Sequence, residues 1–154
     1  MSASVSESEG QIGKPEEAPV VTIRRTVAAP LTHVWEVLVS DAGAEALLGA
    51  GARFGGKGDP YHCTDGVSGV LRSYHPLEQL RVSWHETPDS PPSIVEVDLR
   101  DEGGTTVLDL RQDHLSTVSD VNALSARWTA ALDAVAGHAV RAAPAAEVAA
   151  LQPA

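Results

Sequence analysis

Apolar and polar residues alternate along five stretches of the chain, and this period of two is typical of strands with one buried face. In the first stretch, residues 20–28, Val21, Ile23 and Val27 share one side. The Asp101–Gly104 turn joins the last two stretches and predicts a hairpin. Successive strands with one apolar face predict an antiparallel sheet. The remaining stretches are residues 66–75, 80–84, 95–99 and 106–110, with a short further strand expected near residues 53–54.

Three other stretches have apolar residues at helical spacing. Two short helices are expected over residues 31–41 and over Asp41–Leu48. The longest helix is expected over residues 120–140, with Ser119 or Asp120 as its N-cap. The predicted sheet has one apolar face that needs a cover, and this long helix carries one apolar stripe. The helix is therefore predicted to pack across the sheet. The stripe consists of Val121, Leu124, Trp128, Ala131, Leu132 and Val135.

The three tryptophans fall in three different elements of this pattern. Trp35 lies in the first short helix, Trp84 in a central strand and Trp128 in the long helix. Only 4% of the residues are aromatic, so these large side chains are expected to anchor their elements to one core. The order of elements predicts an α+β fold, with two short helices inserted after the first strand and one long helix at the C-terminal end.

The two ends of the chain have the composition of loosely ordered segments. Residues 1–19 are rich in Ser, Glu, Gly and Pro and contain too few apolar residues to offset the entropy of ordering. Residues 141–154 form an Ala/Pro-rich tail, in which Pro144 is expected to stop the long helix. A single domain over residues 20–140 is therefore predicted.

Charge and composition narrow the classes of partner. The formal net charge is −10, and no cluster of basic residues is longer than Arg24–Arg25. Nucleic acid and anionic membrane surfaces are therefore excluded as expected partners. No apolar run approaches the roughly 20 residues of a membrane span, and the first residues lack the pattern of a secretory signal. The single cysteine, Cys63, excludes an internal disulfide, and a cytoplasmic location is expected.

Strand periodicity places several polar side chains on the apolar face of the sheet. Side chains two residues apart on a strand lie on the same face. If Trp84 faces the long helix, Glu86 therefore faces it as well. If Leu110 faces the helix, Gln112 and His114 face it too. Polar groups beyond an apolar surface are what a pocket for an amphipathic ligand needs. A Glu beside a His could also serve as an acid/base pair. Side chains at strand ends also commonly reach solvent, and periodicity alone leaves these interpretations open.

Other candidate motifs point away from metal and cofactor chemistry. His62 and Cys63 are neighbours without HxxxH or CxxC spacing, so no metal site is expected. The Gly55–Gly58 run does not open a helix, which indicates a flexible loop rather than a phosphate-binding one. No GxSxG nucleophile motif occurs, and no cofactor is expected. Arg25 is expected to pair with a core acid such as Glu36, or with a ligand carboxylate.

In combination, these residues resemble the START-like (SRPBCC) superfamily and, within it, the heat-shock-chaperone ATPase-activator homology family. The resemblance covers residues 20–140 and implies a helix-grip fold, in which a curved antiparallel sheet grips the C-terminal helix around a cavity. Many members place a tryptophan after the second short helix, where this chain has Leu47-Leu48-Gly49. The resemblance implies no shared catalytic motif. It rests on Ala29-Pro30 with Val34-Trp35, Gly69-Val70, Pro76, Leu80, Trp84, Gly104-Thr105 with residues 107–110, and Trp128, Ala131 and Leu132.

The function expected from this reasoning is non-enzymatic binding of a small hydrophobic or aromatic molecule, which would be lipid-, polyketide- or antibiotic-like. One alternative is an enzyme of the polyketide cyclase or hydrolase type that uses Glu86 and His114. Further alternatives are a chaperone-interacting module and a protein of stress or antibiotic self-resistance that sequesters its ligand. The sequence defines neither the ligand nor a protein partner. The cavity lining is expected to be Trp84, Glu86, Leu108, Leu110, Gln112, His114 and Trp128.

Overall fold

Six strands and three helices make up the part of the chain that the computed structural model describes, which is residues 19–115 and 119–151, with side chains as far as Arg141. The segment predicted to be disordered lies, except for its last residue, outside the described residues. In chain order the elements are β2 (Val21–Val27), α2 (Leu31–Leu38), α3 (Asp41–Leu48), β3 (Pro60–His62), β4 (Ser68–His75), β5 (Gln79–Trp84), β6 (Ser93–Asp101), β7 (Thr106–Asp113) and α4 (Val121–Leu151).

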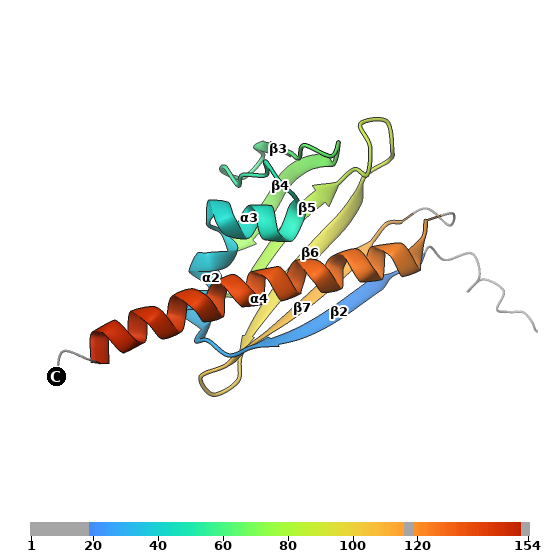
Figure 1. The fold of residues 1–154 in the computed structure, drawn as a ribbon. Coiled ribbons are helices and arrows are strands. Elements are labelled where there is room, and N and C mark those ends of the chain that lie inside the picture. The colour runs from blue at the N-terminus through green and yellow to red at the C-terminus, as the bar shows by residue number, and fades with distance from the viewer. Residues whose placement is uncertain (1–18, 116–118, 152–154) are drawn as a thin grey trace, which may run out of the picture.

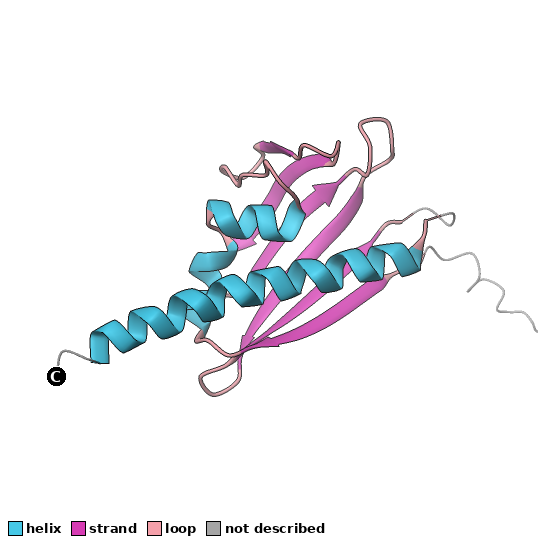
Figure 2. Cartoon of the chain, in the orientation of Figure 1, coloured by secondary structure: helices cyan, strands magenta, loops and turns pink. Residues whose placement is uncertain are grey.

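The six strands form one antiparallel sheet in the order β2-β7-β6-β5-β4-β3. Helix α4 crosses one face of this sheet, and α2 and α3 lie beside it over the same face (Figure 1). None of the three described helices lies over the opposite face (Figure 2). This arrangement is the helix-grip fold, so the predicted α+β architecture is confirmed.

The core lies between α4 and the sheet, where the two predicted periodicities meet. Along β6, buried and half-buried residues alternate, with Val95, Val97 and Leu99 turned toward the helix. The facing side chains of α4 include Trp128 and Leu132, both fully buried. All three tryptophans are buried as expected, with Trp35, Trp84 and Trp128 9%, 4% and 0% exposed. Burial of aromatic surface on this scale is a main contribution to the stability of a domain this size.

Two local predictions about chain reversal and capping are confirmed. The β6–β7 hairpin turns through Gly103 and Gly104, whose φ values of 72° and 98° favour glycine. At the start of α4, the Oδ1 atom of Asp120 accepts a hydrogen bond of 3.0 Å from the backbone N–H of Ala123. Of the two candidate N-caps, Asp120 is therefore the one that satisfies a free N–H group of the first turn.

The short strand expected at residues 53–54 is instead β3, and the physical reason lies in the charges of α3. Arg53 pairs with Asp41 and Glu45 of α3, which draws this segment away from the sheet. β3 pairs with β4 so that Tyr61 lies opposite Gly69. Any Cβ at Gly69 would lie 1.9 Å from the Ser83 carbonyl oxygen, the atom to which the Tyr61 hydroxyl donates a 2.5 Å hydrogen bond.

The expectation that α4 stops before Pro144 is wrong, because the helix continues to Leu151. Pro144 lacks the N–H group for one helical hydrogen bond. Six of the ten residues 142–151 are alanine, the strongest helix former, which offsets this loss. No described helix, α4 included, is apolar enough over a sufficient length to cross a membrane.

Arg25 forms a structural ion pair, but not with the expected partner. Its guanidinium lies 2.8 Å from a carboxylate oxygen of Asp133 on α4, and both side chains are about half exposed. The pair links the edge strand β2 to the covering helix at the protein surface. The partner of Arg25 is therefore not Glu36, and the ion pair is not buried.

Candidate functional site

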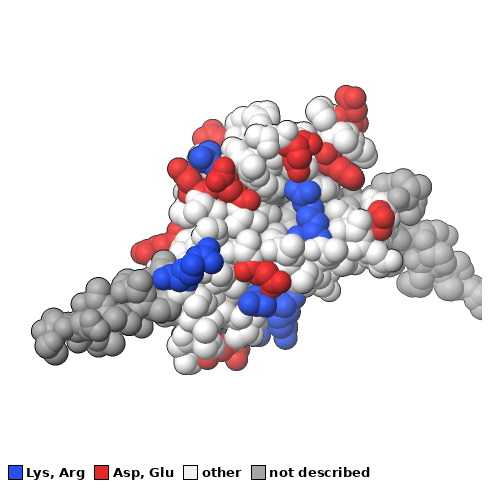
Figure 3. Space-filling view, viewed as in Figure 1, with Lys and Arg blue, Asp and Glu red and all other residues white. Residues whose placement is uncertain are grey.

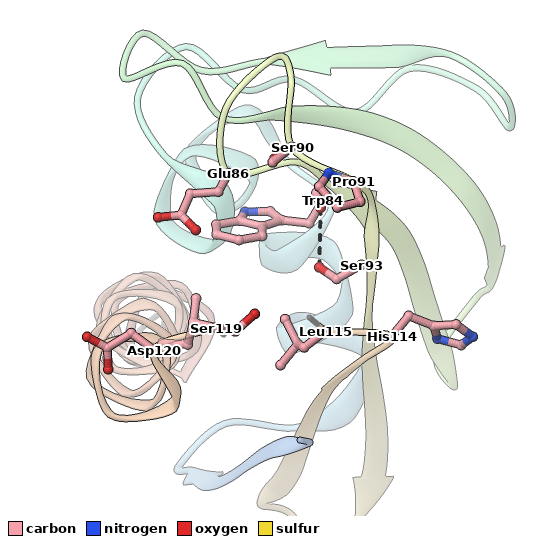
Figure 4. Close-up of a pocket in the computed structure, with 10 residues that line it drawn as sticks. Trp84, Glu86, Ser90, Pro91, Ser93, His114, Leu115, Ser119 and Asp120 are labelled. Carbon is pink, nitrogen blue, oxygen red and sulfur yellow. Dashed lines mark hydrogen bonds between the residues drawn. The ribbon is translucent and has the colours of Figure 1, made fainter. Parts of the chain in front are cut away.

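A cavity of about 360 Å³ opens at the end of the sheet where α4 begins. Its walls come from the end of β5, the loop from β5 to β6, the end of β7 and the first turn of α4 (Figure 4). Its volume is in the range of small-molecule sites. The lining residues are Trp84, Glu86, Ser90, Pro91, Ser93, His114, Leu115, Ser119, Asp120 and Leu124.

The apolar wall of the cavity is organised around Trp84. This residue is the last of β5 and pairs with Ser93, the first of β6, so both side chains lie where the two strands begin to separate. The Trp84 ring meets that of Trp128 edge-on, with centroids 5.6 Å apart and an interplanar angle of 64°. Such edge-to-face pairs are favourable and fix ring orientation. Leu115 and Leu124 add aliphatic surface near this indole.

A chain of hydrogen bonds fixes the floor of the cavity. The indole N–H of Trp128 donates to Oε1 of Gln112 at 2.7 Å, and Nε2 of Gln112 donates to the Ser93 hydroxyl at 2.8 Å. The Ser93 hydroxyl in turn donates to the Trp84 carbonyl at 3.2 Å, the dashed line in Figure 4. Because buried polar groups are costly unless they are paired, this chain holds helix and strands in one arrangement.

Arg127 supports Trp84 from α4. Its guanidinium carbon lies 5.3 Å from the centroid of Trp84 and 5.7 Å from that of Trp128, within range of cation–π attraction. The same group donates a 2.8 Å hydrogen bond to the carbonyl of Leu48, the last residue of α3. A cation is favourable at this end of a helix. Sequence reasoning missed Arg127, although its position next to Trp128 on the edge of the apolar stripe was a usable signal.

The structure brings only part of the predicted lining together. Trp84, Glu86 and His114 border the cavity, whereas four predicted residues belong to the packed core beneath it. These core residues are Leu108, Leu110, Gln112 and Trp128, each at most 1% exposed. The space between α4 and the middle of the sheet is therefore filled by side chains, and the cavity lies at the end of the sheet.

Glu86 and His114 do not face each other. His114 follows the last residue of β7 with a φ of 60°, which ends the strand periodicity that predicted an inward side chain. Its ring points away from the cavity, as Figure 4 shows. The ring nitrogen Nδ1 lies 2.7 Å from Oδ1 of Asp113, and the side chain is 67% exposed. Burial works to raise the pKa of Asp113, but hydrogen bonds from His114 and Arg111 outweigh it and lower that pKa.

A second hollow of about 210 Å³ lies near the other end of β5. The glycine loop begins at this hollow, because Gly55 is one of its lining residues. The loop is closed by the Asp59 carboxylate, which accepts a 2.7 Å hydrogen bond from the Gly56 N–H. The Gly55–Gly58 run therefore does not border the cavity beside Trp84. The lining residues are Trp35, Val39, Phe54, Gly55, Leu71, Tyr74 and Leu80.

Cys63 and Tyr61 are part of the packed interior, whereas His62 is exposed. Cys63 is 8% exposed, and burial raises the pKa of its thiol. Burial likewise raises the pKa of Tyr61, whose hydroxyl is bonded to the Ser83 carbonyl. Within residues 19–115 and 119–141, no three His, Cys, Asp or Glu side chains gather in a way that would hold a metal ion.

Similarity to known proteins is visible in structure rather than in sequence. No family model matches the chain, and no curated protein matches it significantly. Among solved structures, DynU16, from the dynemicin biosynthetic locus, is 18% identical with a TM-score of 0.66, over 77% of this chain and 46% of that one. The chain thus spans less than half of DynU16.

Two further structures are similar over most of both chains. The crystal structure of CalU16 from Micromonospora echinospora is 24% identical with a TM-score of 0.63, over 76% of this chain and 71% of that one. The Aha1 dimer from Colwellia psychrerythraea is 13% identical with a TM-score of 0.63, over 76% and 92%. The chain therefore has the START-like helix-grip fold. This confirms the fold that the sequence predicts, and at these identities the fold alone is established.

Proposed function

We propose that this protein binds a small hydrophobic or aromatic molecule in the cavity of about 360 Å³ and does not alter it chemically. The observation that carries the proposal is a preformed cavity with a buried tryptophan, Trp84, as its wall. An apolar wall with a few polar groups at the mouth is the usual construction of a small-molecule site. The fold is shared with DynU16, a protein in the dynemicin biosynthetic locus, and the ligand class that we propose is polyketide- or antibiotic-like.

The rigidity of the wall supports binding rather than turnover. Trp84 is held between Trp128 and Arg127, and its carbonyl is tied to Ser93. A wall that is ordered before binding loses little further entropy when a ligand arrives. General acid/base catalysis instead requires a proton-transferring group within hydrogen-bond reach of the substrate. The ring of His114 points away, so the expected pair of Glu86 and His114 is not formed (Figure 4).

Calorimetric titration with 2-naphthylmethanol, a neutral aromatic probe, tests the proposal. Leu124 lines the cavity from α4, so Leu124→Phe places a ring in the ligand's space and should weaken binding at least about tenfold, or about 1.4 kcal/mol. Val39 lines the second hollow, and Val39→Phe is the matched control that should leave affinity unchanged. Tight binding that responds to Val39→Phe alone would place the ligand in the second hollow and contradict the proposal. No binding at all would contradict it in favour of the chaperone-interacting alternative.

A further inference from the structure

The mouth of the cavity is bordered by two connecting segments that contain acidic residues but no Lys or Arg. These are residues 85–92, between β5 and β6, and the described residues 114–115 and 119–120, between β7 and α4. Their acidic residues are Glu86, Asp89 and Asp120, and neither segment contains Lys or Arg. On the face shown in Figure 3, the β5–β6 loop carries acidic and no basic side chains. The charge at this mouth is therefore of one sign.

Two of these carboxylates belong to the cavity itself. Glu86 follows β5 and Asp120 lies at the start of α4, so the two residues come from different walls of the cavity. Figure 4 shows that their carboxylates lie toward the same side of the opening. The Glu86 side chain is exposed and takes part in none of the hydrogen bonds or ion pairs found between described residues. Asp120 uses Oδ1 to cap α4, which leaves Oδ2 for another donor. Because the helix dipole offsets part of the Asp120 charge, Glu86 is the stronger candidate to pair with a ligand.

The nearest cations are already engaged elsewhere. Arg127 contacts the Trp84 ring, donates to the Leu48 carbonyl and lies 3.6 Å from an Asp65 oxygen. Arg111 pairs with Asp113 at 3.1 Å. His114 is the lining residue that can become positive, and its ring points away from the cavity. No described cation therefore compensates Glu86 inside the mouth.

We propose that the cavity prefers an aromatic ligand that carries a protonated amine, with the aromatic body against Trp84 and the ammonium group at Glu86. This inference rests on the proposed function, since it names the class of ligand for the same cavity. Because Arg127 already lies close to the Trp84 ring, that ring suits the uncharged part of the ligand. An ammonium group beside the exposed Glu86 carboxylate can form a charge-assisted hydrogen bond. An anionic ligand would meet two carboxylates of its own sign.

Three probes of one shape and different charge test the inference by calorimetry in low salt: 2-naphthylmethylamine, 2-naphthylmethanol and 2-naphthoate. The amine should bind about two- to fivefold tighter than the alcohol, as expected for an ion pair with an exposed carboxylate, and the carboxylate probe most weakly. The advantage of the amine should shrink as sodium chloride is raised from about 0.02 to about 0.5 M, because salt screens exposed charges.

Variants then assign the preference to Glu86. Glu86→Gln should reduce the affinity for the amine about to that for the alcohol, with alcohol binding unchanged. Glu78→Gln removes the same charge from the β4–β5 turn at the opposite end of the sheet and should change nothing. Asp120→Asn retains a good N-cap, so it removes charge while keeping the start of α4, and should cause a smaller loss than Glu86→Gln.

Different outcomes of these titrations would overturn the charge preference and the proposed binding function. If the alcohol binds in the cavity but the amine binds no tighter, or the carboxylate binds as well, the charge preference is overturned and the binding function stands. An amine preference that survives Glu86→Gln overturns the role of Glu86. If none of the three probes binds, the proposed function fails, and the inference fails with it.

Discussion

The indole nitrogen of Trp128 donates a 2.7 Å hydrogen bond to the side-chain oxygen of Gln112, and both residues are fully buried. The bond joins the covering helix α4 to the central strand β7 inside the apolar core. It also determines what Gln112 can do, because the other end of the same amide is bonded to Ser93. Gln112 therefore orders the floor of the cavity and is not exposed to a ligand.

Replacing Gln112 with Leu should destabilise the protein by about 1–3 kcal/mol, the usual cost of leaving buried polar groups unpaired. The change keeps a similar volume but leaves the Trp128 N–H without its acceptor. The free energy of unfolding from urea denaturation measures the effect. Gln79→Leu, which removes a partly buried bond to Asp98, is the control and should cost less. An unchanged unfolding free energy for Gln112→Leu would show that the buried chain does not stabilise the fold.

Trp128 is predicted to be the main anchor of α4. Truncation to Ala should cost roughly 3–5 kcal/mol, because a large buried ring is lost and a cavity remains. That is a large share of a typical stability of about 5–15 kcal/mol. Val20→Ala, at a position 41% exposed, is the control and should change stability by less than about 0.5 kcal/mol. A loss below about 1 kcal/mol at Trp128 would mean that α4 is not the cover of the sheet.

Arg127 is predicted to tie α4 to α3 as well as to support Trp84. Arg127→Met keeps the aliphatic stem but removes the bond to the Leu48 carbonyl and the two cation–π contacts. The expected loss of unfolding free energy is about 1–2 kcal/mol. Arg24→Met removes a more exposed pair with Asp109 and should cost at most about 1 kcal/mol. Equal effects of the two substitutions would argue against a special role for Arg127.

The Cys63 thiol is predicted to react slowly in the folded protein. Burial raises its pKa, so the reactive thiolate fraction at pH 8 is below that of an ordinary cysteine. The thiol also contacts the Leu48 carbonyl at 3.4 Å. Alkylation by iodoacetamide at pH 8, followed by mass spectrometry, should be at least about tenfold slower in the native protein than in urea. Comparable rates in the two conditions would contradict the buried environment.

The sequence predicts the architecture well because periodicity reports directly on which side chains are buried. The alternation of Val95, Val97 and Leu99 and the stripe containing Trp128 and Leu132 are enough to place one helix over one sheet face. Periodicity becomes less reliable where regular structure ends. At His114 the backbone turns to positive φ, and the side chain leaves the direction that β7 would give it.

The cavity is harder to predict than the fold because loops and helix ends supply much of its lining. Pro91, Leu115 and Asp120 meet there through the three-dimensional arrangement of separate connections, and nothing in their spacing along the chain indicates this. Gln112 was predicted to face inward, and its direction agrees with strand periodicity. Its engagement with Trp128 and Ser93, however, depends on where α4 lies and is not visible in sequence.

The most direct test of binding at this cavity follows the three tryptophan indole N–H resonances by NMR while 2-naphthylmethanol is added. Trp84 lines the cavity, Trp128 packs edge-on behind it, and Trp35 lines the separate hollow. The indole signal of Trp84 should shift most and that of Trp128 less, while that of Trp35 stays in place. A shift at Trp35 alone, or no shift at saturating probe, would contradict ligand binding in the proposed cavity.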